Sequence, residues 1–170
     1  MSDSPAAMID ANTYRSALSQ FCSGVTVITA RHDDCVRGMT ATAFTSVSLH
    51  PPMVLICVSA HSRMNAVLQA SESFGVSILR EDQAELAAHF AGRAVARSLR
   101  FESFGDASVI AGALAHVVCE IATTHVEGDH TLYLGRVTAC RASTGRPLLY
   151  YAGDYGRLCT TRDALEAPTA

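Results

Sequence analysis

A run of small residues, TATAFTS at positions 40–46, lies between Gly38 and the pair Pro51-Pro52. Small side chains let a flat ligand approach the backbone of a strand, whose N–H and C=O groups can then bond the polar edge of a heterocycle. The same residues also suit an ordinary strand whose Thr and Ser side chains face water, followed by a turn at the prolines. From the residue types alone both interpretations stay open.

Two polar positions could contact the rest of such a ligand. Ser62 stands where a short helix is predicted to begin, and a helix N-terminus presents free N–H groups and partial positive charge to a phosphate. Ser62 would serve equally well as a helix N-cap without any ligand. His130 follows Asp129 in a predicted tight turn, where a histidine is by default a solvated side chain.

No signature of covalent or metal catalysis accompanies these residues. The sequence has no G-x-G-x-x-G after a strand, no phosphate-binding P-loop and no nucleophile elbow. Its histidines and cysteines lack the repeated spacing of a zinc site, so we expect no metal. The 6 cysteines form no C-x-x-C pair, and most stand in apolar runs, which predicts reduced and buried thiols.

Composition and charge restrict the class of protein. The chain has 170 residues, of which 49% are hydrophobic and 17% charged. This length fits one domain, and the high apolar fraction predicts a partner subunit that covers part of the surface. A net charge of -3 makes nucleic acid a poor ligand. No apolar run approaches the ~18 residues of a membrane span and no signal segment is visible, so we expect a cytoplasmic protein without membrane contact.

Hydrophobic periodicity predicts many strands and few helices. Helices are predicted at 10–21, 62–70 and 83–90. Strands are predicted at 25–30, 39–49, 53–59, 74–79, 113–126, 131–142 and 148–152. Hairpin turns are predicted at 127–129 and 143–145, whereas 91–112 shows no sustained period. The absence of regular strand–helix alternation favours an antiparallel barrel or sandwich over a Rossmann fold. The domain is expected at 10–159, between flexible tails at 1–9 and 160–170.

The small-residue segment, continued through MVLICVS at 53–59, resembles the signature of the short-chain NAD(P)H:flavin reductase family. These proteins are the reductase components of two-component flavin-dependent monooxygenases. Other similar segments are FCSGVTVIT at 21–29, LAAHFAG at 86–92, GALA at 112–115 and, above all, GDHTLYLGRV at 128–137. The resemblance covers roughly 14–158, and the G-D-H turn in this context is rather specific to the family.

The resemblance implies a mainly β fold, an antiparallel, Greek-key FMN-binding split β-barrel with a few short peripheral helices. The small-residue strand would line the isoalloxazine ring, and the loop after the next strand would hold the ribityl chain and phosphate. Phe90 and Arg93 would pack beside the flavin or pair with its phosphate, and Tyr155 would help to cover the site. Many members carry an asparagine in the fourth strand, where this chain has Ser77.

His130 is the implied catalytic position, because the family's turn histidine lies where the nicotinamide docks. The full set implied to bind cofactor is Thr40, Ala41, Thr42, Ala43, Ser46, Cys57, Val58, Ser59, Ser62, Phe90, Arg93, Asp129, His130 and Tyr155.

The implied activity is NAD(P)H-dependent reduction of free flavin, either FMN or FAD. The implied partners are a second copy of the chain, in a homodimer, and a separate oxygenase that receives reduced flavin by diffusion. No arginine cluster marks a 2′-phosphate pocket, which favours NADH over NADPH as the donor. The main alternative is a non-enzymatic flavin-binding or electron-transfer protein on the same barrel. A pyridoxamine-phosphate-oxidase-like enzyme would need a basic cluster, and the arginines here are dispersed.

Overall fold

The computed structural model describes residues 9–33, 35–96 and 98–160. In these ranges the helices are α1 (Ala11–Leu18), α2 (Arg63–Gln69) and α3 (Ala84–Phe90). The strands are β1 (Ser23–Gly24), β2 (Thr26–His32), β3 (Cys35–Ala41), β4 (Phe44–Leu49), β5 (Pro52–Ser59), β6 (Ser73–Ile78), β7 (Phe101–Phe104), β8 (Ala107–Ile110), β9 (Ala115–Glu127), β10 (His130–Ala142), β11 (Leu148–Tyr151) and β12 (Asp154–Arg157). The predicted class, mainly β with a few short helices, is confirmed.

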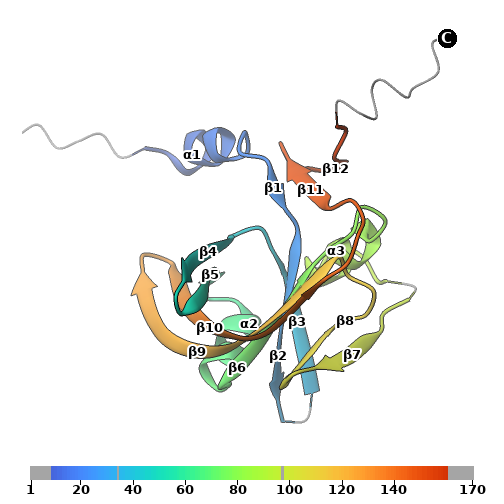
Figure 1. Ribbon diagram of the computed structural model, residues 1–170. Coiled ribbons are helices and arrows are strands. Elements are labelled where there is room, and N and C mark those ends of the chain that lie inside the picture. The colour runs from blue at the N-terminus through green and yellow to red at the C-terminus, as the bar shows by residue number, and fades with distance from the viewer. Residues whose placement is uncertain (1–8, 34, 97, 161–170) are drawn as a thin grey trace, which may run out of the picture.

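The main sheet has 7 strands in the order β3-β2-β6-β9-β10-β5-β4, and every pair in it is antiparallel. Its two edges, β3 and β4, are separated along the chain by Thr42 and Ala43 alone. Three Cα–Cα steps span at most about 11 Å, so the two edges must meet at this crossing. The sheet therefore curls into a barrel that is pinned at the crossing, although β3 and β4 do not pair with each other (Figure 1).

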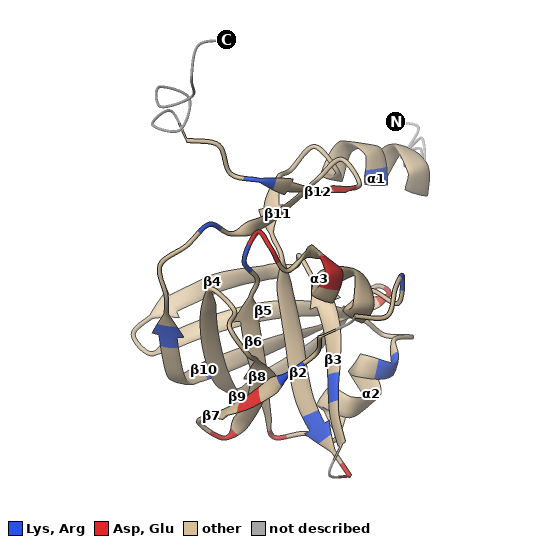
Figure 2. Cartoon of the chain, turned by 90° about the vertical axis from the view of Figure 1, so that its right-hand side faces the viewer, with Lys and Arg blue, Asp and Glu red and all other residues tan. Residues whose placement is uncertain are grey.

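A smaller sheet, β1-β11-β12, stands at one end of the barrel together with α1 (Figures 1 and 2). The hairpin turn predicted at 143–145 is wrong, because β10 and β11 lie in different sheets. Both sides of β10 are already paired, with β9 and with β5, so the chain after Ala142 must cross to another partner. It finds that partner in β1, where Ser23 faces Tyr150.

Two further strand predictions need correction. The strand predicted at 39–49 is broken at Thr42–Ala43, and its first part begins earlier, at Cys35. The unassigned stretch 91–112 contains the hairpin of β7 and β8, and β12 was not predicted. These strands have only 4 residues each, too few for a period to stand out.

Two clusters of buried side chains form the core. The larger one lies between the main sheet and α2, and it consists of Ile28, Ala30, Ala41, Val54, Ile56, Val58, Met64, Leu68, Phe74, Val76, Cys119 and Tyr133. The smaller one joins α3 to β8, β11 and the start of β2, and it consists of Val25, Val27, Leu79, Ala87, Ile110, Ala113 and Leu148. Each helix that faces a cluster is thereby fixed to the barrel.

Helix α1 is the exception, since none of its residues is buried. Its N-terminus is capped by the Asp10 carboxylate, which accepts hydrogen bonds from the backbone of Asn12 and Thr13. After the helix ends, Ala152 N–H donates to the Ser19 carbonyl at 3.0 Å, and the Tyr151 hydroxyl donates to Gln20 Oε1 at 2.9 Å. The predicted amphipathic helix is present, but the described residues of this chain leave its apolar face exposed.

The cysteine prediction holds only in part. All 6 thiols are free, but Cys119 alone is buried and Cys57 is half-buried. The other cysteines, at 22, 35, 140 and 159, are exposed. An apolar run in a strand sends alternate side chains to opposite faces, so membership of such a run does not imply burial.

The described residues contain neither a candidate metal site nor a membrane-spanning helix. No group of three His, Cys, Asp or Glu side chains among them could hold a metal ion. The helices in the described ranges, at 7 or 8 residues, are all too short to cross a bilayer. The tails expected at 1–9 and 160–170 fall outside the description except for Ile9 and Thr160.

Candidate functional site

A groove of about 810 Å³ opens beside the Thr42–Ala43 crossing. One wall comes from the crossing and the outer face of β5, and the opposite wall comes from α1 and the chain that follows it. Its lining residues are Tyr14, Arg15, Ser16, Leu18, Ser19, Phe21, Ser23, Thr42, Ala43, Phe44, Thr45, Leu55, Cys57, Tyr150, Ala152 and Gly153. Of the implied cofactor residues, the groove brings together Thr42, Ala43 and Cys57.

The crossing is fixed by backbone hydrogen bonds. The Cys57 N–H donates to the Ala43 carbonyl at 3.2 Å, and the Phe44 N–H donates to the Thr42 carbonyl at 3.0 Å. Thr42 and Ala43 are themselves exposed. A planar ligand in the groove would therefore meet main chain and small side chains at this wall.

The rest of the small-residue strand lies outside the groove. The Thr40 hydroxyl donates to the Ala87 carbonyl at 2.7 Å, which ties β3 to α3. Ala41 is part of the larger core cluster, and Ser46 is exposed on β4. Strand alternation and the break at the crossing separate these three residues from their neighbours at 42 and 43.

Strand β5 extends the site beyond the groove. Leu55, Cys57 and Ser59 lie on its outer face, alternating with core residues. Val58, implied as a cofactor contact, is 1% exposed and points into the core, so only its backbone could contact a ligand. Ser59 lies directly opposite His130 of β10. The implied nicotinamide position is thus two residues along β5 from the groove-lining Cys57.

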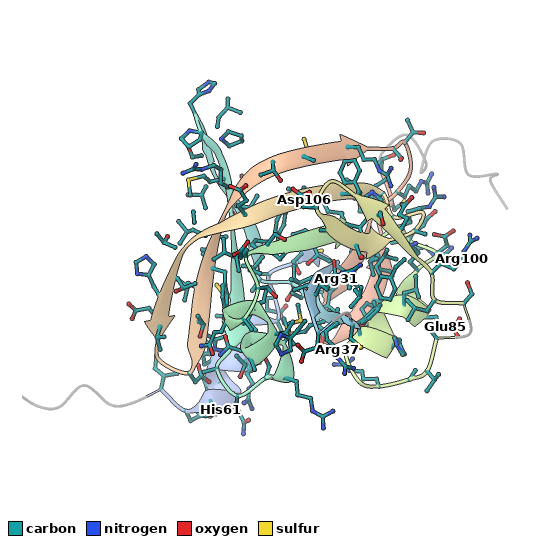
Figure 3. All side chains as sticks on the ribbon, turned by 90° about the horizontal axis from the view of Figure 1, so that it is seen from below. Arg31, Arg37, His61, Glu85, Arg100 and Asp106 are labelled. Carbon is teal, nitrogen blue, oxygen red and sulfur yellow. The ribbon has the colours of Figure 1, made fainter. Side chains whose placement is uncertain are left out.

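The loop after β5 packs against the turn between β9 and β10. Ala60 N–H donates to the Asp129 carbonyl at 2.9 Å. His130 Nδ1 lies 2.7 Å from Asp129 Oδ1, and the hydrogen bond and charge of His130 lower the pKa of the Asp129 carboxyl. Gly128 adopts a φ of 58°, which this tight turn requires and which favours glycine. His61, labelled in Figure 3, belongs to the same loop.

Asn65, a buried residue of α2, holds this loop in place and was not singled out from the sequence. Its Nδ2 donates to the Ala60 carbonyl at 3.2 Å, and its Oδ1 accepts from the Tyr133 hydroxyl at 2.6 Å. Its backbone N–H donates to Ser62 Oγ at 3.0 Å, so Ser62 is a helix N-cap. A polar residue next to Met64 on the buried side of a short helix was the signal that could have identified Asn65.

Arg93 and Tyr155 reach the groove through Tyr150. The rings of Tyr150 and Tyr155 lie 5.7 Å apart, and Tyr150 lines the groove. Arg93 is hydrogen-bonded to Tyr150, and this bond with the nearby phenols raises the pKa of the guanidinium. Burial raises the pKa of Tyr155, against the opposing effect of Arg93.

Phe90 and Ser77 serve packing in this structure. The Phe90 ring occupies the space beside Gly38, where an added Cβ would come within 2.6 Å of it, and the ring packs against the smaller core cluster. Ser77 is fully buried, and its Oγ accepts the Ile110 N–H at 2.9 Å. Neither side chain lines the groove.

The groove suits a flavin. Its volume falls within the ~300–1,000 Å³ typical of small-molecule sites. Backbone and small side chains at the crossing leave room for a flat ring, and the tyrosine and phenylalanine side chains on the other walls can pack on its faces.

Fold and site together define a small split barrel with a groove suited to a planar ligand, and comparison with known proteins identifies its family. The model of the flavin reductase like domain matches residues 18–158. The chain belongs to this family.

An NADH-dependent flavin reductase of a Rhodococcus species is 41% identical over 148 residues, which cover 85% of this chain and 84% of that protein. The reductase component of 4-hydroxyphenylacetate 3-monooxygenase from Thermus thermophilus is 40% identical, over 85% of this chain and 95% of that protein. Among solved structures, a flavin reductase in its native state superposes with a TM-score of 0.87 at 38% identity, over 89% of this chain and 100% of that one. These likenesses support the reductase interpretation rather than the non-enzymatic alternative.

Proposed function

We propose that this chain uses NADH to reduce free flavin, FMN or FAD, and releases the reduced flavin to a separate oxygenase. The observation that carries the proposal is the groove at the Thr42–Ala43 crossing, in a chain of the flavin reductase family. Residues 10–159 act as one catalytic unit in this proposal.

Each part of the site has a role in binding and orientation. The crossing and Cys57 bind the polar edge of the flavin ring, and Tyr150, backed by Tyr155, covers the groove. The loop from Ser59 to Ser62 holds the ribityl chain of the flavin. When bound, the flavin supplies the acceptor for a hydride from the nicotinamide.

His130 seats the nicotinamide. Its side chain is 45% exposed, and the Asp129 carboxylate orients its ring through Nδ1. The Asp129 contact holds the His130 imidazole in one orientation, and His130 pairs with Ser59 of β5, next to the groove. The imidazole can therefore contact a second planar ligand, the nicotinamide, that binds beside the flavin. The main task of the protein is to stack the nicotinamide on the flavin ring in the orientation that hydride transfer needs. This task requires no side chain to act as an acid or a base.

We also propose that the chain works as a homodimer. Tyr14, Leu18 and Phe21 are 58%, 53% and 77% exposed, and they form part of the groove wall. A second copy packed on this face would bury apolar surface and complete the groove. Sedimentation at micromolar concentration is expected to give a dimer mass. A monomeric mass with intact activity would refute this proposal.

A cytoplasmic location agrees with the free cysteines, since thiols persist in reducing compartments. Fractionation of cells that produce the protein would test this location.

The test of the proposed function is oxidation of NADH and NADPH by the purified protein, with and without FMN, FAD or riboflavin. We expect turnover that depends on added flavin and is faster with NADH. Absence of turnover with every combination, relative to a protein-free control, would show that the chain is not a flavin reductase.

A further inference from the structure

Arg15 is the only charged residue among those that line the groove in the described part of the chain. It stands in the last turn of α1, and it lines the groove together with Thr42 and Ala43 of the crossing. Its side chain is exposed, and within the described ranges its guanidinium makes no ion pair and no side-chain hydrogen bond. A cation with no protein partner therefore faces an otherwise uncharged groove.

The other groups considered for a phosphate already have protein partners. Arg93 is hydrogen-bonded to Tyr150, and Ser62 Oγ accepts the Asn65 N–H. Neither Arg93 nor Ser62 lines the groove. Among the described residues that line the groove, Arg15 is therefore the cation available to an anionic group of a bound ligand.

We propose that Arg15 binds a phosphate group of the ligand in the groove. This inference rests on the proposed function and adds to it the residue that recognises the anionic end of the ligand. A guanidinium can donate two parallel hydrogen bonds to phosphate oxygens, which a lysine ammonium does not reproduce. The aromatic side chains of Tyr14 and Phe21 on the same wall pack against the planar part of the ligand while Arg15 holds its charge.

Two sources of phosphate are present in the reaction, the flavin and the nicotinamide dinucleotide, and riboflavin distinguishes them because it carries no phosphate. The variants are Arg15→Gln, Arg15→Lys and the control Arg37→Gln. Arg37, labelled in Figure 3, is exposed on β3 and does not line the groove. Steady-state kinetics are measured with NADH and each of riboflavin, FMN and FAD, and flavin affinity is measured separately by fluorescence titration.

If Arg15 contacts the flavin phosphate, Arg15→Gln raises KM and Kd for FMN and FAD about tenfold and leaves riboflavin unchanged. If it contacts the dinucleotide, KM for NADH rises by a similar factor with all three flavins. In either case Arg15→Lys retains part of the effect of the charge, and Arg37→Gln behaves as wild type.

The proposal is overturned if Arg15→Gln leaves all these constants within about twofold of wild type, or if riboflavin weakens as much as FMN while KM for NADH is unchanged. Lack of turnover by the wild-type protein would instead contradict the proposed function, and the fluorescence titrations would still decide the role of Arg15.

Discussion

Helices α1 and α2 both border the candidate site, but the protein holds them by different means. In α2, Met64 and Leu68 are buried in the larger core cluster, and Asn65 bonds to the Tyr133 hydroxyl inside the barrel. In α1 no residue is buried, and the chain just after it is tied to Tyr151 and Ala152 by two hydrogen bonds. The site thus combines a loop that the core fixes through α2 with a groove wall that is held mainly at the end of α1.

This difference separates two tasks of a protein that binds and releases its ligands. Burial of α2 sets the loop that contains Ser62 and the neighbouring His130 in fixed positions, which orientation of a hydride donor requires. Within one chain α1 has no buried residue, so its position can change without disturbing the barrel, and in the proposed dimer the second copy would be what holds it in place.

The most direct test applies the same substitution to both helices. Leu68 is 1% exposed, so Leu68→Ala is expected to destabilise the protein by about 2–5 kcal/mol through lost burial and a cavity. Leu18→Ala is expected to change unfolding of the barrel by less than about 0.5 kcal/mol and to weaken the dimer. Chemical denaturation at several protein concentrations separates the two effects. Equal losses of barrel stability would remove the distinction between the helices.

The polar connection of α2 is expected to be the next largest effect. Asn65→Leu removes the side-chain partner of the Ala60 carbonyl and leaves the Tyr133 hydroxyl only its longer bond to the backbone carbonyl of residue 65, at 3.3 Å, for a cost of about 2 kcal/mol. Adding Tyr133→Phe should recover part of this loss, because it removes the buried hydroxyl as well. Thermal unfolding of the two single variants and the double variant tests this coupling. Strictly additive losses would mean that the hydrogen bond does not account for the stability.

His130 should affect kinetics without affecting stability. His130→Ala is expected to raise KM for NADH or to slow hydride transfer about tenfold, the equivalent of roughly 1–2 kcal/mol. Because the side chain is half-exposed, the melting temperature and flavin affinity should stay near wild type. Wild-type kinetics would make His130 a bystander, and parallel losses of flavin binding and melting temperature would make it structural.

Cysteine labelling offers the smallest and most local measurement. Burial raises the pKa of the Cys57 thiol, and it raises that of Cys119 to about 12, so both carry less thiolate than an exposed cysteine at the same pH. Alkylation followed by peptide mass spectrometry should modify the exposed Cys140 faster than Cys57, and Cys119 slowest. Of these three cysteines, added FMN should slow Cys57 alone. Slowing of Cys140 to the same degree would place the flavin elsewhere.

The sequence supported the fold class and part of the groove. The family resemblance implied that Thr42, Ala43 and Cys57 bind the cofactor, and the structure brings these three residues together at one wall of the groove. It did not reveal the break between β3 and β4, because threonine and alanine are compatible with a continuous strand. The break follows from closure of the sheet edges, a long-range constraint that local residue preferences do not report.

The opposite wall was harder to predict for a different reason. Periodicity indicated the helix at 10–21, but a pattern of apolar residues does not identify what the apolar face contacts. Tyr150 likewise belongs to a predicted strand in which nothing in the sequence distinguishes it from its neighbours. It lies beside the groove because β11 pairs with β1. Asn65 gave a faint signal, since its role depends on Tyr133, 68 residues away.

The crossing at Thr42–Ala43 also sets where the length of the chain can change. An inserted residue there would let the two sheet edges separate by up to about 3.3–3.6 Å and would shift the Ala43 carbonyl away from the Cys57 N–H. The second connection between separate sheets is residues 144–145, which are exposed and lie between the hydrogen bonds of Ser143 to Leu114 and of Arg146 to Glu81, so added length there costs little. Natural insertions and engineered tags should therefore be tolerated at the second connection and excluded from the first.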